Sequence, residues 1–208
     1  MALFSFGVDA MDELRRVKLR LARALRRAVE AHEAIVMRAF ATLQPKLYQA
    51  PVGGPWWRRP HQPQRIIAPA DLLPVCSRAS AETSVFLLEA IHEAARQAMR
   101  SGGKAAIASV DLPLTFTLAH PQAVQYLERC ADELLEQLNS ALHGQIAKLK
   151  RARAAHIART LRRLYRDMAL NRSRLIAQQV VESARRAGSA IVIRDLQSAG
   201  IRVVQCSG

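Results

Sequence analysis

The stretch Asp111–Cys130, DLPLTFTLAHPQAVQYLERC, contains the two patterns on which the fold of this chain depends. Apolar and polar residues alternate from Leu114 to Leu118, which is typical of a short β-strand. A His-Pro pair follows, and apolar residues then recur at helical spacing. Pro121 suits the first turn of a helix, where its missing N–H needs no partner. The stretch therefore predicts one short strand that leads directly into a helix of residues 121–149.

The remainder of the chain indicates a mainly α-helical protein. Ala and Leu dominate an apolar content of 50%, a composition that favours closely packed helices. Helical periodicity predicts further helices at about 9–48, 80–99 and 152–168, and a last helix with Asn171 as its N-cap. Gly102 and Gly103 suit a helix end, because glycine tolerates a left-handed turn.

These patterns predict three regions. The regions are an N-terminal amphipathic helix (1–49), a Pro-rich extended arm (50–79) and a helical domain (80–208) with short strands near 114–118 and 201–205. A strand of about five residues is not stable alone. We therefore expect 114–118 to pair with the tail at 201–205. Addition to a sheet edge of a partner protein is the alternative.

The arm owes its predicted extended form to proline. Residues 50–74 hold six of the nine prolines of the chain. Each proline lacks a backbone donor and fixes φ, which excludes a helix or a central strand. The arm also carries a tryptophan pair followed by two arginines: Trp56, Trp57, Arg58 and Arg59. An exposed tryptophan pair favours docking onto a partner. Folding of both rings onto the chain's own core is an equally good interpretation.

Positive charge is concentrated in one part of the chain. The formal net charge is +14, and residues 148–186 hold 12 basic and 2 acidic residues, a balance of +10. Such an excess favours a polyanionic partner, most often nucleic acid, with an acidic protein surface or an anionic membrane as alternatives. The predicted contact residues are Lys148, Lys150, Arg151, Arg153, Arg159, Arg162, Arg163 and Arg166.

A second set of arginines recurs along the predicted N-terminal helix: Arg16, Arg20, Arg23 and Arg27. These residues lie on one helix face, which is either a phosphate-binding stripe or a solvated surface. The solvated surface is the favoured interpretation, because charged helix faces are usually solvated.

Motifs of known enzyme classes are missing from the sequence, so we expect no catalytic residues, no cofactor and no metal ion. His32-Glu33 and His92-Glu93 lack the second histidine of a zinc-protease motif. An acidic patch at 132–136 is better explained as a solvated helix face than as a metal site. Three widely spaced cysteines indicate no disulfide framework and favour a reducing compartment. Neither a signal peptide nor a transmembrane helix is expected.

Three segments, in this order and spacing, carry a resemblance to a known family. They are FTLAHPQAVQYL (Phe116–Leu127), IARTL (Ile157–Leu161) and RLIAQQVVESARRAG with the following SAG (Arg174–Gly200). From Leu87 to Val204, the chain resembles the tailed-phage head morphogenesis family, the minor head proteins related to the F protein of Mu-like phages. It departs from the family at 176–180, where IAQQV replaces the usual Ile-Ala-Arg-Thr-Glu.

The resemblance implies a structural minor capsid protein, present in several copies per virion. Such a protein lies in the capsid interior or at the portal vertex, and in the host cytoplasm during assembly. Its implied partners are the portal protein, the major capsid or scaffolding protein, and double-stranded DNA bound without sequence preference. The alternative is a free cytoplasmic helical protein that binds nucleic acid non-specifically, such as an architectural factor.

Overall fold

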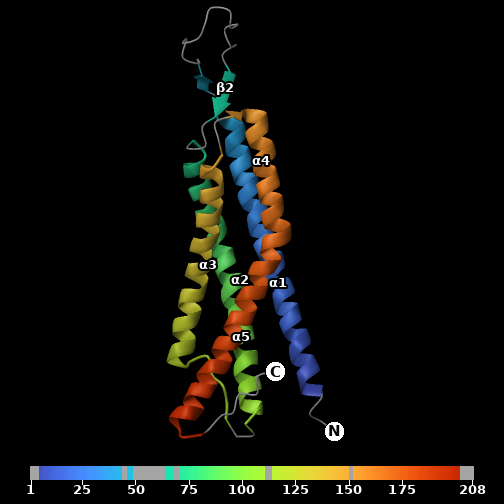
Figure 1. Ribbon diagram of the computed structural model, residues 1–208, viewed down its shortest axis with the longest axis vertical. Helices are drawn as coiled ribbons and strands as arrows, with labels where there is room; N and C mark the ends of the chain where they lie inside the picture. Colours follow the sequence, from blue (N-terminus) through green and yellow to red (C-terminus); the bar gives the residue numbers. More distant parts are fainter. Residues whose placement is uncertain are drawn as a thin grey trace, which may run out of the picture.

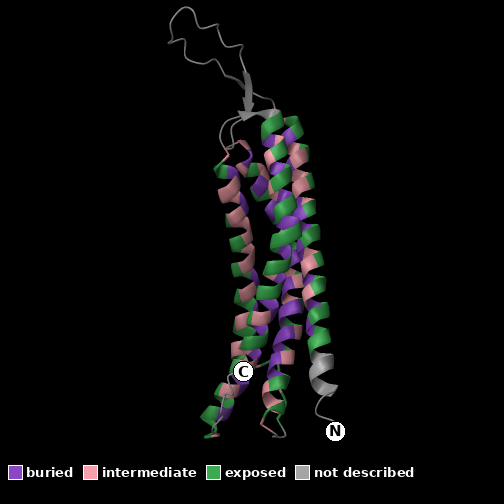
Figure 2. Ribbon diagram, turned by 45° about the vertical axis from the view of Figure 1, so that its right-hand side comes forward, coloured by how far each residue is buried: buried purple, intermediate pink, exposed green. Residues whose placement is uncertain are grey.

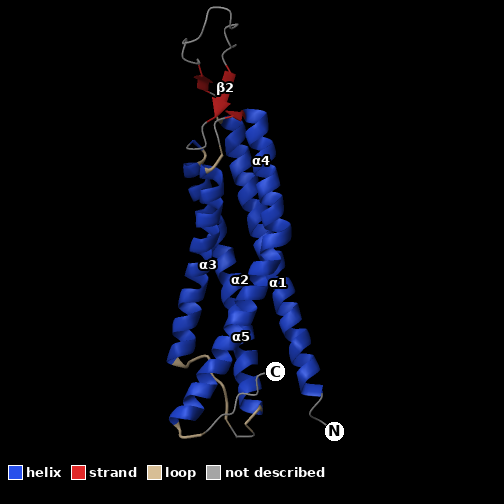
Figure 3. Cartoon of the chain, viewed as in Figure 1, coloured by secondary structure: helices blue, strands red, loops and turns tan. Residues whose placement is uncertain are grey.

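The protein is an elongated bundle of helices. The computed structural model describes residues 5–43, 46–48, 64–67, 71–110, 114–149 and 152–201. Its α-helices are α1 (Ser5–Thr42), α2 (Leu73–Ala108), α3 (Pro121–Ala147), α4 (Ala154–Asp167) and α5 (Ser173–Ser198). They run roughly along one axis (Figure 1), and helix accounts for most of the described chain (Figure 3). The prediction of a mainly α-helical protein is confirmed.

Two hydrophobic clusters follow one another along the bundle, and Figure 2 shows the buried residues on the inward faces of the helices. One cluster joins the first part of α1 to α2, the start of α3 and α5. The other joins the second part of α1 to the start of α2, the end of α3 and α4. α1 thus contributes to both clusters. Its buried residues Leu14, Val17, Leu21, Leu25 and Ala28 recur at steps of three and four, which keeps them on one face.

The last helix does not begin at Asn171 as predicted. α4 continues through a π-helical turn, Met168–Arg172, directly into α5. The side-chain amide of Asn171 donates to Asp167 Oδ1 at 2.8 Å, one turn earlier, instead of capping a new helix. Ser173 Oγ donates to the Met168 carbonyl at 3.0 Å. Burial of Met168 and Ala169 holds this turn in the core, so tertiary packing prevails over the local capping signal.

Gly102 and Gly103 lie inside α2, so the predicted helix end at this pair is also wrong. A Cβ atom at Gly102 would lie 2.0 Å from the carbonyl oxygen of Arg185 in α5. A Cβ atom at Gly103 would lie 2.3 Å from the ring of Phe116. Both glycines thus permit close contact with the α2 backbone, and α2 continues through them to Ala108. At its other end α2 begins at Leu73, with Pro74 in its first turn.

The predicted strand at 114–118 does not form. Residues 114–117 have no regular secondary structure and a turn follows, while 202–205 lie outside the described residues. Phe116 lies over Gly103 and packs against the hydrophobic cluster that joins the first part of α1 to α2, α3 and α5. Side-chain packing, not backbone pairing, therefore holds this segment. Phe116 and Leu118 of the alternating pattern pack against this cluster, whereas Leu114 is exposed.

A small antiparallel sheet lies instead at the end of the bundle where α1 ends and α4 begins (Figures 1 and 3). Its strands, in the order β1-β2-β3, are Lys46–Tyr48, Gln64–Ile67 and Ala152–Arg153. β2 is the central strand of this sheet and corrects the expectation that no central strand would form in the Pro-rich arm, because QRII is a proline-free run of four residues. The predicted docking residues at 56–59 lie outside the described residues.

The helices of the described ranges were also compared with the requirements of a membrane span. None of them is both long and apolar enough to cross a bilayer.

Candidate functional site

The outer face of α4 presents four arginines, Arg159, Arg162, Arg163 and Arg166, all of them exposed. At 100° per residue they fall within an arc of about 100°, opposite the buried face that carries Ile157, Leu161 and Tyr165. They span about 10 Å along the helix axis, from the 1.5 Å rise per residue. The basic face of α4, as we call this set, is therefore compact and directed to solvent.

The basic face of α4 carries unneutralised charge. None of its four guanidinium groups makes a hydrogen bond or an ion pair within the described part of the chain. The acidic residue that follows, Asp167, contacts Arg172 Nε at 3.5 Å and Asn171. Like charges this close on a helix repel one another, so an anion bound across the face would reduce this repulsion.

None of the other predicted contact residues has a described position on the basic face of α4. Lys148 is exposed at the C-terminal cap of α3. Arg153 lies in β3, where only its backbone is described, and Lys150 and Arg151 lie outside the described residues. α4 begins directly after β3, so the basic segment 148–153 leads into the basic face along the chain.

The arginines of α1 form a longer and narrower stripe. Arg16, Arg20, Arg23 and Arg27 are all exposed and lie within an arc of about 60°, roughly opposite the buried face of α1. Exposure on one face is common to a solvated surface and to a phosphate-binding stripe, so the choice between these two interpretations stays a prediction. The stripe has the same number and type of charges as the basic face of α4, which makes it a matched control.

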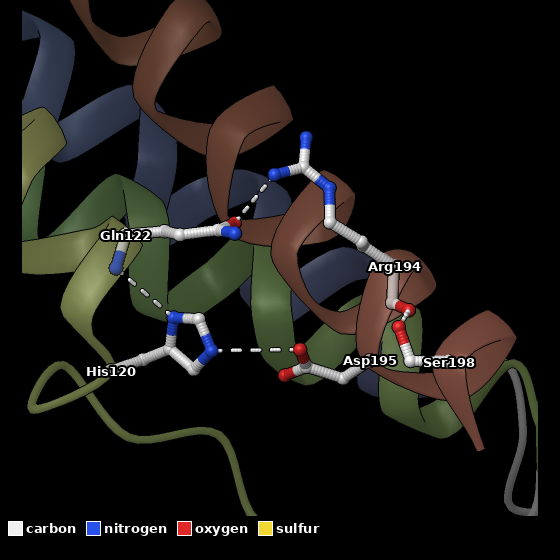
Figure 4. A network of polar contacts seen from close by, with 5 residues as sticks. All are labelled: His120, Gln122, Arg194, Asp195 and Ser198. Atoms are coloured by element: carbon white, nitrogen blue, oxygen red, sulfur yellow. Dashed lines mark hydrogen bonds and ion pairs between the residues drawn. The ribbon is translucent and has the colours of Figure 1, made fainter.

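A polar junction joins the start of α3 to the end of α5 (Figure 4). His120 caps α3, and its Nδ1 accepts from the Gln122 backbone N–H at 3.2 Å. In the neutral ring Nε2 then carries the proton, and it faces Asp195 Oδ1 at 3.5 Å. Arg194 Nη1 donates to Gln122 Oε1 at 2.9 Å.

This His-Asp pair has the composition of part of a hydrolase site, but its neighbourhood argues for a structural role. The hydroxyl of Ser198, the nearby candidate nucleophile in Figure 4, donates to the Arg194 carbonyl at 2.9 Å and not to His120. Nδ1 of His120 is engaged as a helix cap. The junction joins α3 to α5, and among the described residues no hydroxyl or thiol group hydrogen-bonds to His120.

A second polar cluster is buried where α1, α2 and α4 meet, and no sequence pattern beyond the residue types indicates it. His32 Nδ1 lies 2.9 Å from the Tyr165 hydroxyl, and His32 Nε2 lies 3.1 Å from Ser80 Oγ. Burial lowers the pKa of His32 to about 4 and raises the pKa of the Cys76 thiol to about 11. His32 is thus neutral at pH 7 and acts as a core residue.

His143 of α3 lies near this cluster, and its positive form would further lower the pKa of His32. Its Nε2 is buried without a hydrogen-bond partner among the described residues. Within those residues, no group of three or more His, Cys, Asp or Glu side chains could hold a metal ion.

The chain was compared with protein-family models, with curated proteins and with solved structures, and none of the three comparisons finds a match.

Proposed function

We propose that this protein is a non-enzymatic structural component of a tailed-phage head, which contacts packaged double-stranded DNA through the basic face of α4 without reading its sequence. The observation that carries the proposal is the set of four exposed arginines on one face of α4, without partners in the described part of the chain. The head assignment rests on the resemblance of the sequence from Leu87 to Val204.

The geometry of the basic face suits a phosphate backbone. One strand of a duplex carries a phosphate per about 3.4 Å of axis, so a length of about 10 Å places about three phosphates of each strand within the span of the four arginines. Arginine pairs with phosphate through two parallel hydrogen bonds. The face carries no asparagine or glutamine, the side chains that read adenine. Binding by charge without base recognition is the simplest use of such a surface.

The DNA contact is tested with two quadruple variants. The first replaces Arg159, Arg162, Arg163 and Arg166 with Gln, and the control replaces Arg16, Arg20, Arg23 and Arg27 with Gln. Both variants lose the same net charge from exposed helical positions. Fluorescence anisotropy with a 30-base-pair duplex should show a loss of at least about 30-fold for the first variant and a much smaller loss for the control. Equal losses would refute a localised interface.

The head assignment is tested separately. The portal ring and the major capsid protein of the same genome are used in pull-downs at about 0.15 M and about 0.5 M salt, which bracket weak and strong screening. Portal binding that survives high salt supports the virion role, with the arm that carries Trp56 and Trp57 as the proposed docking segment. Binding to DNA alone, lost at high salt, would favour a free cytoplasmic nucleic-acid-binding protein.

A further inference from the structure

A groove lies between the first part of α1 and α5, separate from the basic face of α4. Its volume is about 880 Å³, and its walls belong to α1 from Met11 to Lys18 and to α5 from Val181 to Ile193. Lys18 Nζ donates to Glu182 Oε1 at 3.0 Å and bridges the two helices. Figure 1 shows α1 and α5 diverging from their crossing toward the N-terminal end of α1.

The groove is apolar at its base. Leu14 and Val181 are buried there, Ile193 is half-buried, and Met11 is exposed at 61% of its surface. An exposed methionine beside buried aliphatic side chains gives an adaptable surface for an apolar partner residue. The side chains of these four residues offer an entering group no hydrogen bond, so the base suits an apolar helix face.

The rim of the groove is basic. Arg15, Arg185 and Arg186 line it, and none of them makes a hydrogen bond or ion pair with another described residue. Glu182 is already engaged by Lys18 and Gln178, and the Lys18 hydrogen bond is the main cause of its lowered pKa. Asp12 is the remaining acid of the rim. The groove therefore places Arg15 and Arg185, whose guanidinium groups have no described partner, around an apolar base, together with Arg186, whose charge also lowers the pKa of Glu182.

We propose that this groove binds an amphipathic, acidic α-helix of a partner protein. The apolar face of such a helix would cover Met11, Leu14 and Val181, and its flanking carboxylates would pair with the three arginines, as in other helix-in-groove complexes. The stretch of α5 from Val181 to Ile193 is about 18 Å long, which corresponds to a ligand helix of about 12 residues.

The same features disfavour other occupants. DNA would pair with the arginines but leave the apolar base uncovered. A flat membrane surface does not follow a concave groove. A second copy of this chain would bring a net charge of +14 toward a basic rim, which opposes association. Charge complementarity and the apolar base are satisfied together by an acidic amphipathic helix.

The test uses the full-length chain and a fluorescein-labelled 14-residue peptide with leucines on one helix face and glutamates on both flanks. Its control peptide has every Glu replaced by Gln. Anisotropy at about 0.1 M salt should show at least about tenfold tighter binding of the acidic peptide. Equal binding of the two peptides would overturn the proposal.

Variants of the protein locate the peptide. Arg185→Glu with Arg186→Glu should weaken peptide binding at least about tenfold, whereas Arg16→Glu with Arg23→Glu makes the same charge change outside the groove and should have less than about a threefold effect. Met11→Ser, at an exposed position, should also weaken binding. Circular dichroism checks that each variant is folded.

DNA serves as the competing probe. The quadruple α4 variant should bind the peptide as the wild type does. A failure of the groove proposal can therefore be distinguished from a failure of the proposed DNA contact. Loss of duplex binding by Arg185→Glu with Arg186→Glu, together with unchanged peptide binding, would assign the groove to DNA and refute the proposal.

Discussion

Gly188 of α5 packs directly against the backbone of Met99 in α2. A Cβ atom at Gly188 would lie 2.2 Å from the Met99 carbonyl oxygen and 3.1 Å from the Gly103 nitrogen. Ser189 Oγ donates to the Gly102 carbonyl at 3.0 Å beside this contact. The crossing of α2 and α5 therefore depends on main-chain atoms in contact, and it positions the α5 wall of the groove.

We expect Gly188→Ala to destabilise the protein, because the added methyl group meets rigid backbone. The expected loss in the free energy of unfolding is about 1–3 kcal/mol, typical of overpacking. Gly144→Ala is the control, since a Cβ atom there meets nothing within 4 Å. It should stabilise α3 by about 0.5–1 kcal/mol. Urea denaturation measures both, and a stable Gly188→Ala would contradict the close crossing.

The stability of the protein should fall as the pH is lowered from about 6.5 to about 4. The pKa of His32 is lowered to about 4 in the folded state, against an unfolded value of 6.5. The unfolded chain therefore binds more protons in this window, and stability present above pH 6.5 is lost as the pH falls. The pKa difference corresponds to an order of about 3 kcal/mol.

Unfolding at pH 7 and at pH 5 checks this dependence. His32→Gln should reduce the difference between the two pH values, because it removes the buried titrating group. His156→Gln changes an exposed histidine and should leave the difference unchanged. A wild-type protein equally stable at both pH values would contradict the buried neutral His32.

Phe116→Asp should destabilise the junction of α2 with the 114–120 segment. The ring packs over Gly103 and is partly buried, so its loss is expected to cost about 1–3 kcal/mol, less than for a fully buried phenylalanine. Leu114→Asp is the control in the same segment, because Leu114 is 46% exposed. Thermal denaturation should separate the two variants, and equal melting curves would refute the packing role of Phe116.

Duplex binding should depend on salt in proportion to the arginines of α4. Each arginine that neutralises a phosphate contributes about 0.9 to the slope of log Kobs against log salt. Arg159→Gln with Arg163→Gln should therefore reduce the slope by about 2. Arg20→Gln with Arg23→Gln should leave the slope nearly unchanged. Anisotropy titrations between about 0.05 M and 0.2 M salt measure this slope. An equal reduction of the slope in both double variants would contradict a DNA contact localised on α4.

The sequence by itself determined the mainly helical fold class and the charged faces of α1 and α4. The steps from Leu14 to Ala28 place one apolar face on α1, and the spacing of Arg159, Arg162, Arg163 and Arg166 places them together on α4. Both patterns depend only on residues within a few turns of each other. A helical period is sufficient to predict them.

Only the tertiary structure decided what the glycines, Asn171 and His32 do. Gly102 is equally suited to a helix end and to close packing, and the choice depends on Arg185, far along the chain. Burial of Met168 turned an expected cap into a continuous helix. The partners of His32 come from α2 and α4, and the groove exists because α1 and α5 diverge. These features arise from contacts between distant segments, whose free energy exceeds the local preferences that a sequence pattern records.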